Sequence, residues 1–402
     1  MSSRTSRSPS ARAAAVALAV ALAATAAGCG RAGSSDTATP DRPKIGVKGD
    51  TGSAADLGFP VLATKNTTRI AGADPIADAA AATQIVYPGG PAGARPGAVT
   101  LVDSANWQAA VAASVLDAPP LHAPTLFVNG RSIPAATGKA LTALAPTGAK
   151  AAAGAQVIRV GTVARPAKLR PTDIKGGSPA AIAKAIDAFA TAARGKASRR
   201  VLVVTSEDPA YAAPAAAWAA TSGDPILFTG KSHVPPETIS AIRAHDKPKI
   251  YVLGPSTVVT PEVTKELKGL GKIIRVGGQN PITNAIGFAT YSDGDFGWGA
   301  TTPGHGLVMV PQTADPATAP AVAPLSASGT YGPLLLLSAP DTLDRDVGGY
   351  LKDIQPGFDQ NAARGFFNHA WLVGDTKAIT AGLQAEVDDN LETRPIATKN
   401  AG

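Results

Sequence analysis

The sequence has few of the residues that reactive and cross-linked sites require. Among 402 residues there is one cysteine, Cys29, so no disulfide can form within the chain and packing must hold the fold together. The five histidines show no metal-like spacing, and no Gly-x-Ser-x-Gly nucleophile elbow is present. A hydrolase would therefore lack an organised nucleophile. We expect no enzyme activity, no metal and no cofactor.

Aromatic residues and charge are also modest. Aromatics make up 5% of the chain, whereas apolar residues make up 45%, many of them alanine. Alanine-rich cores favour closely packed helices and thin layers. There are 37 Lys and Arg against 30 Asp and Glu, and loss of a leader containing Arg4, Arg7 and Arg12 would leave 34 against 30. Such a mild excess permits an acidic partner without requiring one, and we expect no nucleic-acid partner.

Residues 1–28 have the features of an export signal, with a positive start and an apolar run too short to span a membrane comfortably. The run ends Ala26-Ala27-Gly28-Cys29, which resembles a bacterial lipobox. In a lipobox the cysteine sulfur takes a diacylglycerol with acyl chains such as palmitate. We expect Cys29 to anchor the exported protein to the outer face of the cytoplasmic membrane. Residues 29–66, rich in Gly, Ser, Thr, Asp and Pro, read as a flexible tether.

The rest of the chain repeats one order of apolar strands and helices three times. First strands begin near Val99, Val201 and Leu307, and each is followed by a helix and a second apolar run. Continuous apolar strands alternating with helices predict parallel sheets covered on both faces. The sequence therefore predicts an α/β fold of three tandem Rossmann-like modules, at residues 67–167, 168–272 and 273–402.

A glycine-bearing turn opens each repeat. Arg69 to Ile76 recurs as Arg275 to Ile282, and a weaker copy runs from Ile174 to Pro179. Each ends in Asp, Asn or Ser followed by Pro, the preferred start of a helix. The glycines suit tight turns better than phosphate binding, because no full dinucleotide or P-loop pattern is present. Asn106, Asp208 and Asp315 lie after the first strands, where capping is the stronger interpretation and ligand contact the alternative.

With these motifs laid out, the chain resembles the cell wall-binding repeat 2 family over almost everything after residue 66. The resemblance implies non-enzymatic modules of Toprim-like fold, packed around a pseudo-threefold axis, that hold anionic wall polymers non-covalently. It implies polymer contacts at Arg69, Arg275 and Lys175, although each arginine is equally well explained as a brace for its glycine turn. It also implies three site-shaping strand runs, which begin at Pro124, Pro225 and Pro333.

The sequence thus predicts an envelope lipoprotein that binds a wall glycopolymer, either an anionic polymer or a peptidoglycan-linked glycan. One alternative is a solute-binding lipoprotein that serves a transporter, which should have two lobes around one cleft. Another is a protein-interaction scaffold. It stays open because Pro75-Ile76 and Pro281-Ile282 stand where family copies usually carry Arg-Tyr.

Overall fold

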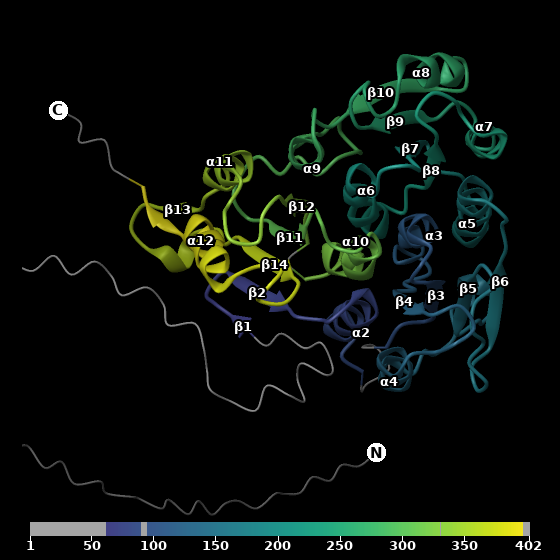
Figure 1. The fold of residues 1–402 in the computed structure, drawn as a ribbon, viewed down its shortest axis with the longest axis horizontal. Helices are drawn as coiled ribbons and strands as arrows, with labels where there is room; N and C mark the ends of the chain where they lie inside the picture. Colours follow the sequence, from purple (N-terminus) through teal and green to yellow (C-terminus); the bar gives the residue numbers. More distant parts are fainter. Residues whose placement is uncertain (1–61, 90–94, 330, 397–402) are drawn as a thin grey trace, which may run out of the picture. The chain divides into compact units, whose positions relative to one another are not determined.

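The computed structural model describes residues 62–89, 95–329 and 331–396. Cys29, the export signal and nearly all of the expected tether lie outside these residues. The described part is an α/β structure in which short helices alternate with buried strands (Figure 1). Among its helices, none combines the length and hydropathy needed to cross a bilayer.

Three parallel sheets share one strand order. The first sheet has the order β4 (Thr125–Val128), β3 (Val99–Asp103), β5 (Val157–Val160), β6 (Pro171–Ile174). The second has β8 (Ile226–Thr229), β7 (Arg200–Thr205), β9 (Lys249–Leu253), β10 (Lys272–Val276). The third has β12 (Leu334–Leu337), β11 (Gly306–Pro311), β14 (His369–Val373), β2 (Thr67–Ile70), with β1 (Leu62–Ala63) antiparallel at its edge. The strands expected to begin near Val99, Val201 and Leu307 therefore occupy the same inner position three times.

The edge strands show how the repeats interlock. β6 and β10 each pair with the last strand of the preceding repeat. β2 lies at the start of the first repeat, yet it pairs in parallel with β14 of the last, placing Arg69 opposite Leu372 and Ile70 opposite Val373. The first two sheets are thus each completed by a strand from the next repeat, and the third is completed by β2 of the first repeat. Sheet boundaries are offset from the sequence repeats by one strand.

Helices begin where the capping residues predict. Asp74, Ser178 and Asn280 cap α2 (Pro75–Val86), α5 (Pro179–Arg194) and α9 (Pro281–Thr290) through their side chains. Asn106 and Asp208 likewise cap α3 (Trp107–Ala113) and α6 (Pro209–Ser222). These caps satisfy backbone N–H groups that the first helical turn leaves free, which confirms the capping interpretation.

Asp315 differs from its counterparts. Its carboxylate accepts from the backbone N–H of Ala317 at 2.8 Å, but α10 (Thr318–Val322) begins only at Thr318 and is five residues long. A 3-10 segment, Ala323–Ala327, follows. Pro320 and Pro324 lack backbone donors and interrupt the α-helical ladder, which explains the short helix.

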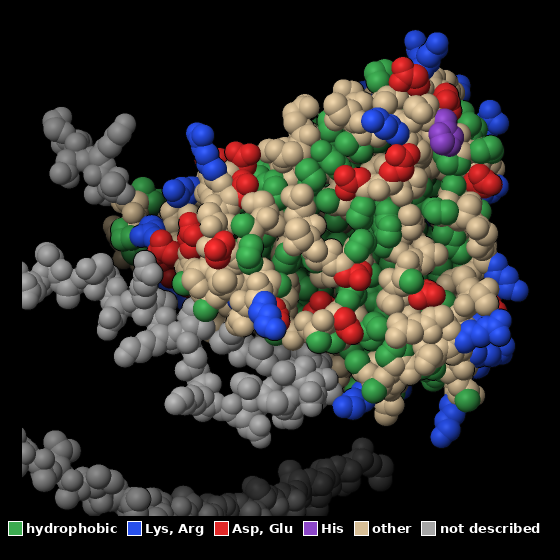
Figure 2. Space-filling model, viewed as in Figure 1, with side chains coloured by type: hydrophobic (Ala, Val, Ile, Leu, Met, Phe, Trp, Pro, Cys, Tyr) green, Lys and Arg blue, Asp and Glu red, His purple; other side chains and the backbone are tan. Residues whose placement is uncertain are grey.

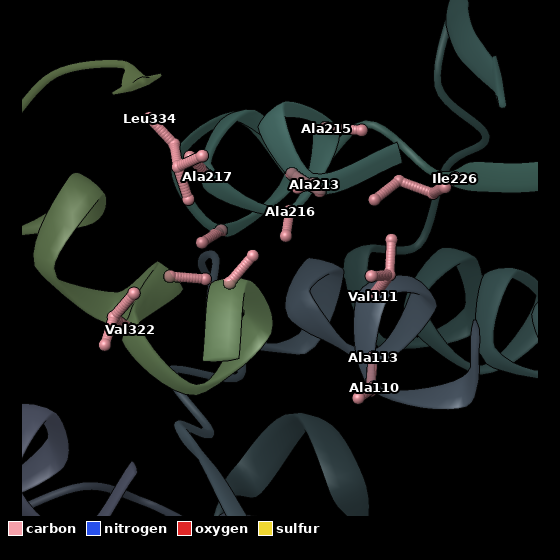
Figure 3. Close-up of a cluster of buried hydrophobic side chains, with 14 of the residues drawn as sticks. Ala110, Val111, Ala113, Ala213, Ala215, Ala216, Ala217, Ile226, Val322 and Leu334 are labelled. Carbon is pink, nitrogen blue, oxygen red and sulfur yellow. The ribbon is translucent and has the colours of Figure 1, made fainter. Parts of the chain in front are cut away.

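The core lies where helices of all three repeats meet. α3, α6 and α10 each contact the other two. Figure 3 shows alanines at this contact, Ala110 and Ala113 on α3 and Ala213, Ala215, Ala216 and Ala217 on α6, together with Val322 on α10. These alanines are buried. Small side chains let the helices approach closely, so these alanines serve the contacts between repeats.

The remaining helices cover the sheets, and a short two-stranded pairing follows the last of them. They are α4 (Ala135–Leu144), α7 (Pro236–Arg243), α8 (Pro261–Leu267), α11 (Arg345–Asp353) and α12 (Ala381–Leu391). After α12, β15 (Arg394–Pro395) pairs in parallel with β13 (Gly357–Phe358).

Candidate functional site

Arg69, predicted as a polymer contact or a turn brace, is fully buried on β2. Its Nη1 donates to the carbonyl oxygens of Gly374 and Asp375 at 2.9 and 3.0 Å, and its Nε donates to Gln384 Oε1 at 3.1 Å. Burial lowers the pKa of this guanidinium, opposed by the charge of Asp375. A buried side chain cannot reach a wall polymer, so the geometry corresponds to the brace. It ties the N-terminal strand to the loop after β14.

Arg275 on β10 makes the corresponding contacts in the second sheet. Its Nη1 donates to the carbonyl oxygen of Gly254 at 2.6 Å and its Nη2 to that of Val259 at 2.7 Å. The residue is exposed overall, but two of its donors are used within the fold. Arg275 therefore also braces a loop, the one that follows β9.

Lys175 lies apart from both arginines. It directly follows β6 at the edge of the first sheet and is exposed. Arg69, Arg275 and Lys175 belong to three different sheets, and the fold does not gather them into one site. The residue of β6 that matches the arginines in strand register is Asp173, opposite Arg159.

The three proline-led runs are core strands. Pro124, Pro225 and Pro333 are buried, and each run after them is buried throughout. Their carbonyl oxygens accept from the backbone N–H groups of Thr100, Leu202 and Val308 at 2.9, 2.9 and 3.0 Å. A proline has no N–H to leave unpaired at the outer edge of a sheet. These residues therefore shape the sheets from inside.

A pocket of about 490 Å³ opens at the carboxyl edge of the third sheet. The residues that end three of its strands, Pro311, Leu337 and Val373, lie in its wall. This is the edge at which open α/β sheets bind ligands. Because β2 and α2 come from the first repeat, the pocket needs both ends of the described chain.

Acidic side chains dominate this pocket. Asp74, Asp78, Asp315 and Asp375 line it, against a single cation, Lys377. On the face drawn in Figure 2, acidic side chains gather over the region of α2 and α10. Asp375 Oδ1 accepts from the backbone N–H groups of Lys377 and Ala378, both at 2.9 Å, so it also holds the loop together. The excess of carboxylates disfavours an anionic ligand here.

Asp78 is the unusual member of the pocket, and sequence reasoning missed it. It is 4% exposed, and burial raises its pKa to about 7, opposed by the backbone N–H of Gly72 and assisted by the charge of Asp74. The Gly72 N–H donates to Asp78 Oδ1 at 3.0 Å. One carboxyl in an alanine-rich helix, four residues after the cap, was the available signal.

No group of three or more His, Cys, Asp and Glu side chains in the described part of the chain is arranged to hold a metal ion. His245 pairs with Asp187, and the Nε2 of His369 shares a hydrogen bond with the hydroxyl of Thr68.

The family model "Cell wall binding domain 2 (CWB2)" matches residues 174–264, the second repeat. Among solved structures, Cwp6 from Clostridium difficile is similar with a TM-score of 0.61 and 16% identity, over 80% of this chain and 48% of that one. Cwp8 from Clostridium difficile is similar with a TM-score of 0.60 and 16% identity, over 82% of this chain and 52% of that one. No curated protein matches the chain in sequence.

The chain spans about half the length of these two structures, and at this identity the likeness concerns the fold. It extends over all three sheets, whereas the family match covers the second repeat alone. Residues 174–264, which contain β7, β8 and β9 of the second sheet, therefore match the CWB2 family of cell wall binding domains.

Proposed function

We propose that this protein binds the cell wall non-covalently at the cell envelope, through three related modules and without catalysis. The observation that carries the proposal is the CWB2 match at residues 174–264, set in a chain whose other two sheets repeat the same strand order. The ligand we propose is an anionic glycopolymer of the wall. Three linked modules can raise avidity above single-site affinity by about 10²–10⁴.

The packing of the modules supports a Toprim-like, pseudo-threefold arrangement as part of the proposal. α3, α6 and α10 follow the inner strand of each sheet and contact one another pairwise. Three equivalent helices related by such an axis would meet in this way. The solute-binding alternative calls for two lobes around one cleft, which three sheets of identical order do not favour.

We also propose that Cys29 carries the lipid anchor, on the basis of the lipobox-like Ala26-Ala27-Gly28-Cys29. A diacylglyceryl group provides two acyl chains, and two anchoring signals give stable attachment where one is marginal. Cys29→Ala should release the protein to the medium or leave it unprocessed. Unchanged membrane retention and lipid labelling of this variant would show that the anchor lies elsewhere.

The binding experiment uses purified walls in two forms, one with secondary anionic polymers retained and one with them removed. We expect the protein to sediment with the first form and largely to stay in solution with the second. Equal binding to both would point to peptidoglycan itself. No binding to either would favour the scaffold alternative, in which the modules contact another envelope protein.

A further inference from the structure

A groove of about 800 Å³ runs along the amino-terminal edge of the second sheet. The acidic pocket described above lies at the carboxyl edge of the third sheet. Arg200 and Lys249, which begin β7 and β9, lie in its wall, and we call it the β7–β9 groove. Three Asp side chains line it, Asp224, Asp246 and Asp295. Six cationic side chains line it as well: Arg194, Lys196, Arg199, Arg200, Lys247 and Lys249.

The fold brings these charges together from two loops. One loop follows α5, which ends at Arg194, and leads into β7. The other follows α7 and leads into β9. β7 and β9 are parallel neighbours with Arg200 opposite Lys249, so both loops enter the sheet at the same edge. Cations about fifty residues apart in sequence therefore line one groove.

Part of the positive charge is neutralised within the fold. Arg200 Nε lies 3.0 Å from Asp224 Oδ2, and Lys249 Nζ lies 3.2 Å from Asp293 Oδ2. The other rim cations, Lys196, Arg199 and Lys247, are exposed. They make no ion pair with any residue that the structure describes. Three cations thus remain available to a ligand.

Helix ends oppose this charge but do not cancel it. α5 and α6 both terminate at the groove, and a helix C-terminus carries roughly half a negative charge. Arg194 Nη1 donates to the carbonyl oxygen of Gly223 at the end of α6, while its Nε and Nη2 are buried without a partner. Two helix ends contribute about one negative charge. The lining residues carry three more formal cations than anions, and two more when Asp293, the partner of Lys249, is counted, so the excess of cations is larger.

The floor of the groove holds the rim in place. His245 is 5% exposed, with Nε2 2.8 Å from Asp187 Oδ2 on α5 and Nδ1 2.9 Å from the carbonyl oxygen of Ser198. It therefore joins the loop before β9 to the helix and the loop before β7. A rim fixed from below loses less entropy when it binds.

We propose that the β7–β9 groove is the contact site of this chain for an extended polyanion whose phosphate or carboxylate groups recur along a glycan. This inference rests on the proposed wall-binding function and assigns it a place. An open groove with three unpaired cations on two loops suits a linear polymer better than a compact ligand. The equivalent edge of the first sheet has a pocket whose charged lining is limited to Arg95 and Lys150, so the second repeat is the stronger site.

The test compares two triple variants of the full chain. One changes Lys196→Gln, Arg199→Gln and Lys247→Gln at the groove. The matched control changes Lys231→Gln, Lys265→Gln and Lys268→Gln, which are exposed residues of the same repeat outside the groove lining and remove the same charge. Equal thermal unfolding temperatures would establish that both variants are folded.

Binding is measured to inorganic polyphosphate, to poly-L-glutamate and to purified polymer-bearing walls, over a series of salt concentrations. We expect the groove variant to lose at least about tenfold in affinity, with a weaker salt dependence, and the control to lose much less. Polyphosphate against polyglutamate distinguishes phosphate from carboxylate as the preferred group.

The outcomes separate the groove from the function. If the wild type binds walls and the groove variant binds them equally well, the groove assignment is overturned and the wall-binding function stands. If the wild type does not bind walls but binds polyphosphate through the groove, the groove assignment is supported and the wall-binding function is overturned. Equal losses in groove variant and control, or no polyanion binding by the wild type, overturn the groove assignment.

Discussion

Arg159 on β5 donates from Nη1 to Asp173 Oδ1 on β6 at 2.8 Å, and this pair replaces the lone arginine of the other two sheets. The strand register sets Arg159 opposite Asp173, where Arg275 stands opposite Val252 in the second sheet. The first sheet thus carries its arginine on the neighbouring strand. From there Arg159 Nε still donates to a loop carbonyl, that of Ala164, at 3.1 Å.

This exchange predicts the outcome of a double-mutant cycle. Arg159→Val removes the brace and should lower the free energy of unfolding by about 1–3 kcal/mol, because loop carbonyls lose their donors. Adding Asp173→Arg recreates the arrangement of Val252 and Arg275 and should recover part of that loss. Urea unfolding of the wild type, both single variants and the double variant measures the coupling. A double variant less stable than Arg159→Val alone would contradict the proposed equivalence.

Arg69 and Arg275 should differ sharply in their effect on stability. Arg69→Gln leaves two carbonyl oxygens and Gln384 without their buried donor, so we expect a loss of about 2–4 kcal/mol. Arg275→Gln, at an exposed residue with the same kind of acceptor, should cost about 1 kcal/mol. Denaturant unfolding gives both values. Wall binding by folded Arg69→Gln should be unchanged, and a selective loss of binding would restore the contact role.

The repetition explains how much of the fold the sequence predicts. Buried apolar runs and Asp-Pro or Asn-Pro caps encode local structure, and the strands near Val99, Val201 and Leu307 form where these patterns place them. The pairing of β2 with β14 is a contact across about 300 residues, set by which edge is free once the other strands are paired. No local pattern carries that information.

The site was harder to predict because the sequence shows which residues are charged, whereas tertiary packing determines which of them are buried. Arg69 recurs beside a glycine turn, which suggested a ligand contact, but its burial depends on α12 packing over β2. The groove cations have a sequence signal that is visible only afterwards: Arg199-Arg200 and Lys247 to Lys249 stand at the starts of two strands. Only the parallel pairing of those strands makes them neighbours.

His245 should make stability depend on pH. Burial alone would lower its pKa, but the hydrogen bond and charge of Asp187 and the carbonyl of Ser198 outweigh burial and the charge of Arg194, so the pKa is raised from 6.5. A raised pKa means that the folded state holds the proton more tightly. The stabilisation is therefore fully present below about 6.5 and is lost as the pH rises through the folded value. Unfolding free energies between pH 5 and 9 should fall for the wild type, and by less for His245→Gln.

Asp78 gives a second pH dependence of stability, and the equivalent position of another helix carries an uncharged residue. Asn284 occupies the same place in α9, four residues after the cap Asn280, as Asp78 does in α2 after Asp74. Asn284 is fully buried, and its Nδ2 donates to the carbonyl oxygen of Tyr211 at 3.3 Å. A neutral amide is thus accepted at this position, whereas the carboxyl of Asp78 must ionise inside the protein.

The sign of this effect follows from the shift from 3.8 to about 7. The folded state binds the proton of Asp78 more tightly than the unfolded chain does, so the contribution to stability is fully present below pH 3.8 and is lost as the pH rises to about 7. Three units at 1.36 kcal/mol each set its size at about 4 kcal/mol, an upper figure. Above pH 7 the buried charge is fully expressed.

Asp78→Asn should therefore stabilise the protein at pH 8 by roughly 1–3 kcal/mol, by less at pH 5, and leave it almost unchanged below the unfolded pKa of 3.8. The asparagine oxygen can still accept from the Gly72 N–H, which keeps the turn. Asp74→Asn, an exposed carboxylate in the same pocket, is the matched control and should leave the pH slope near that of the wild type. Chemical denaturation at several pH values measures all three proteins. If Asp78→Asn keeps the wild-type slope between pH 5 and 8, another group causes the pH dependence of stability. The carboxylate charge of Asp78 is then compensated by a contact outside α2 and its turn.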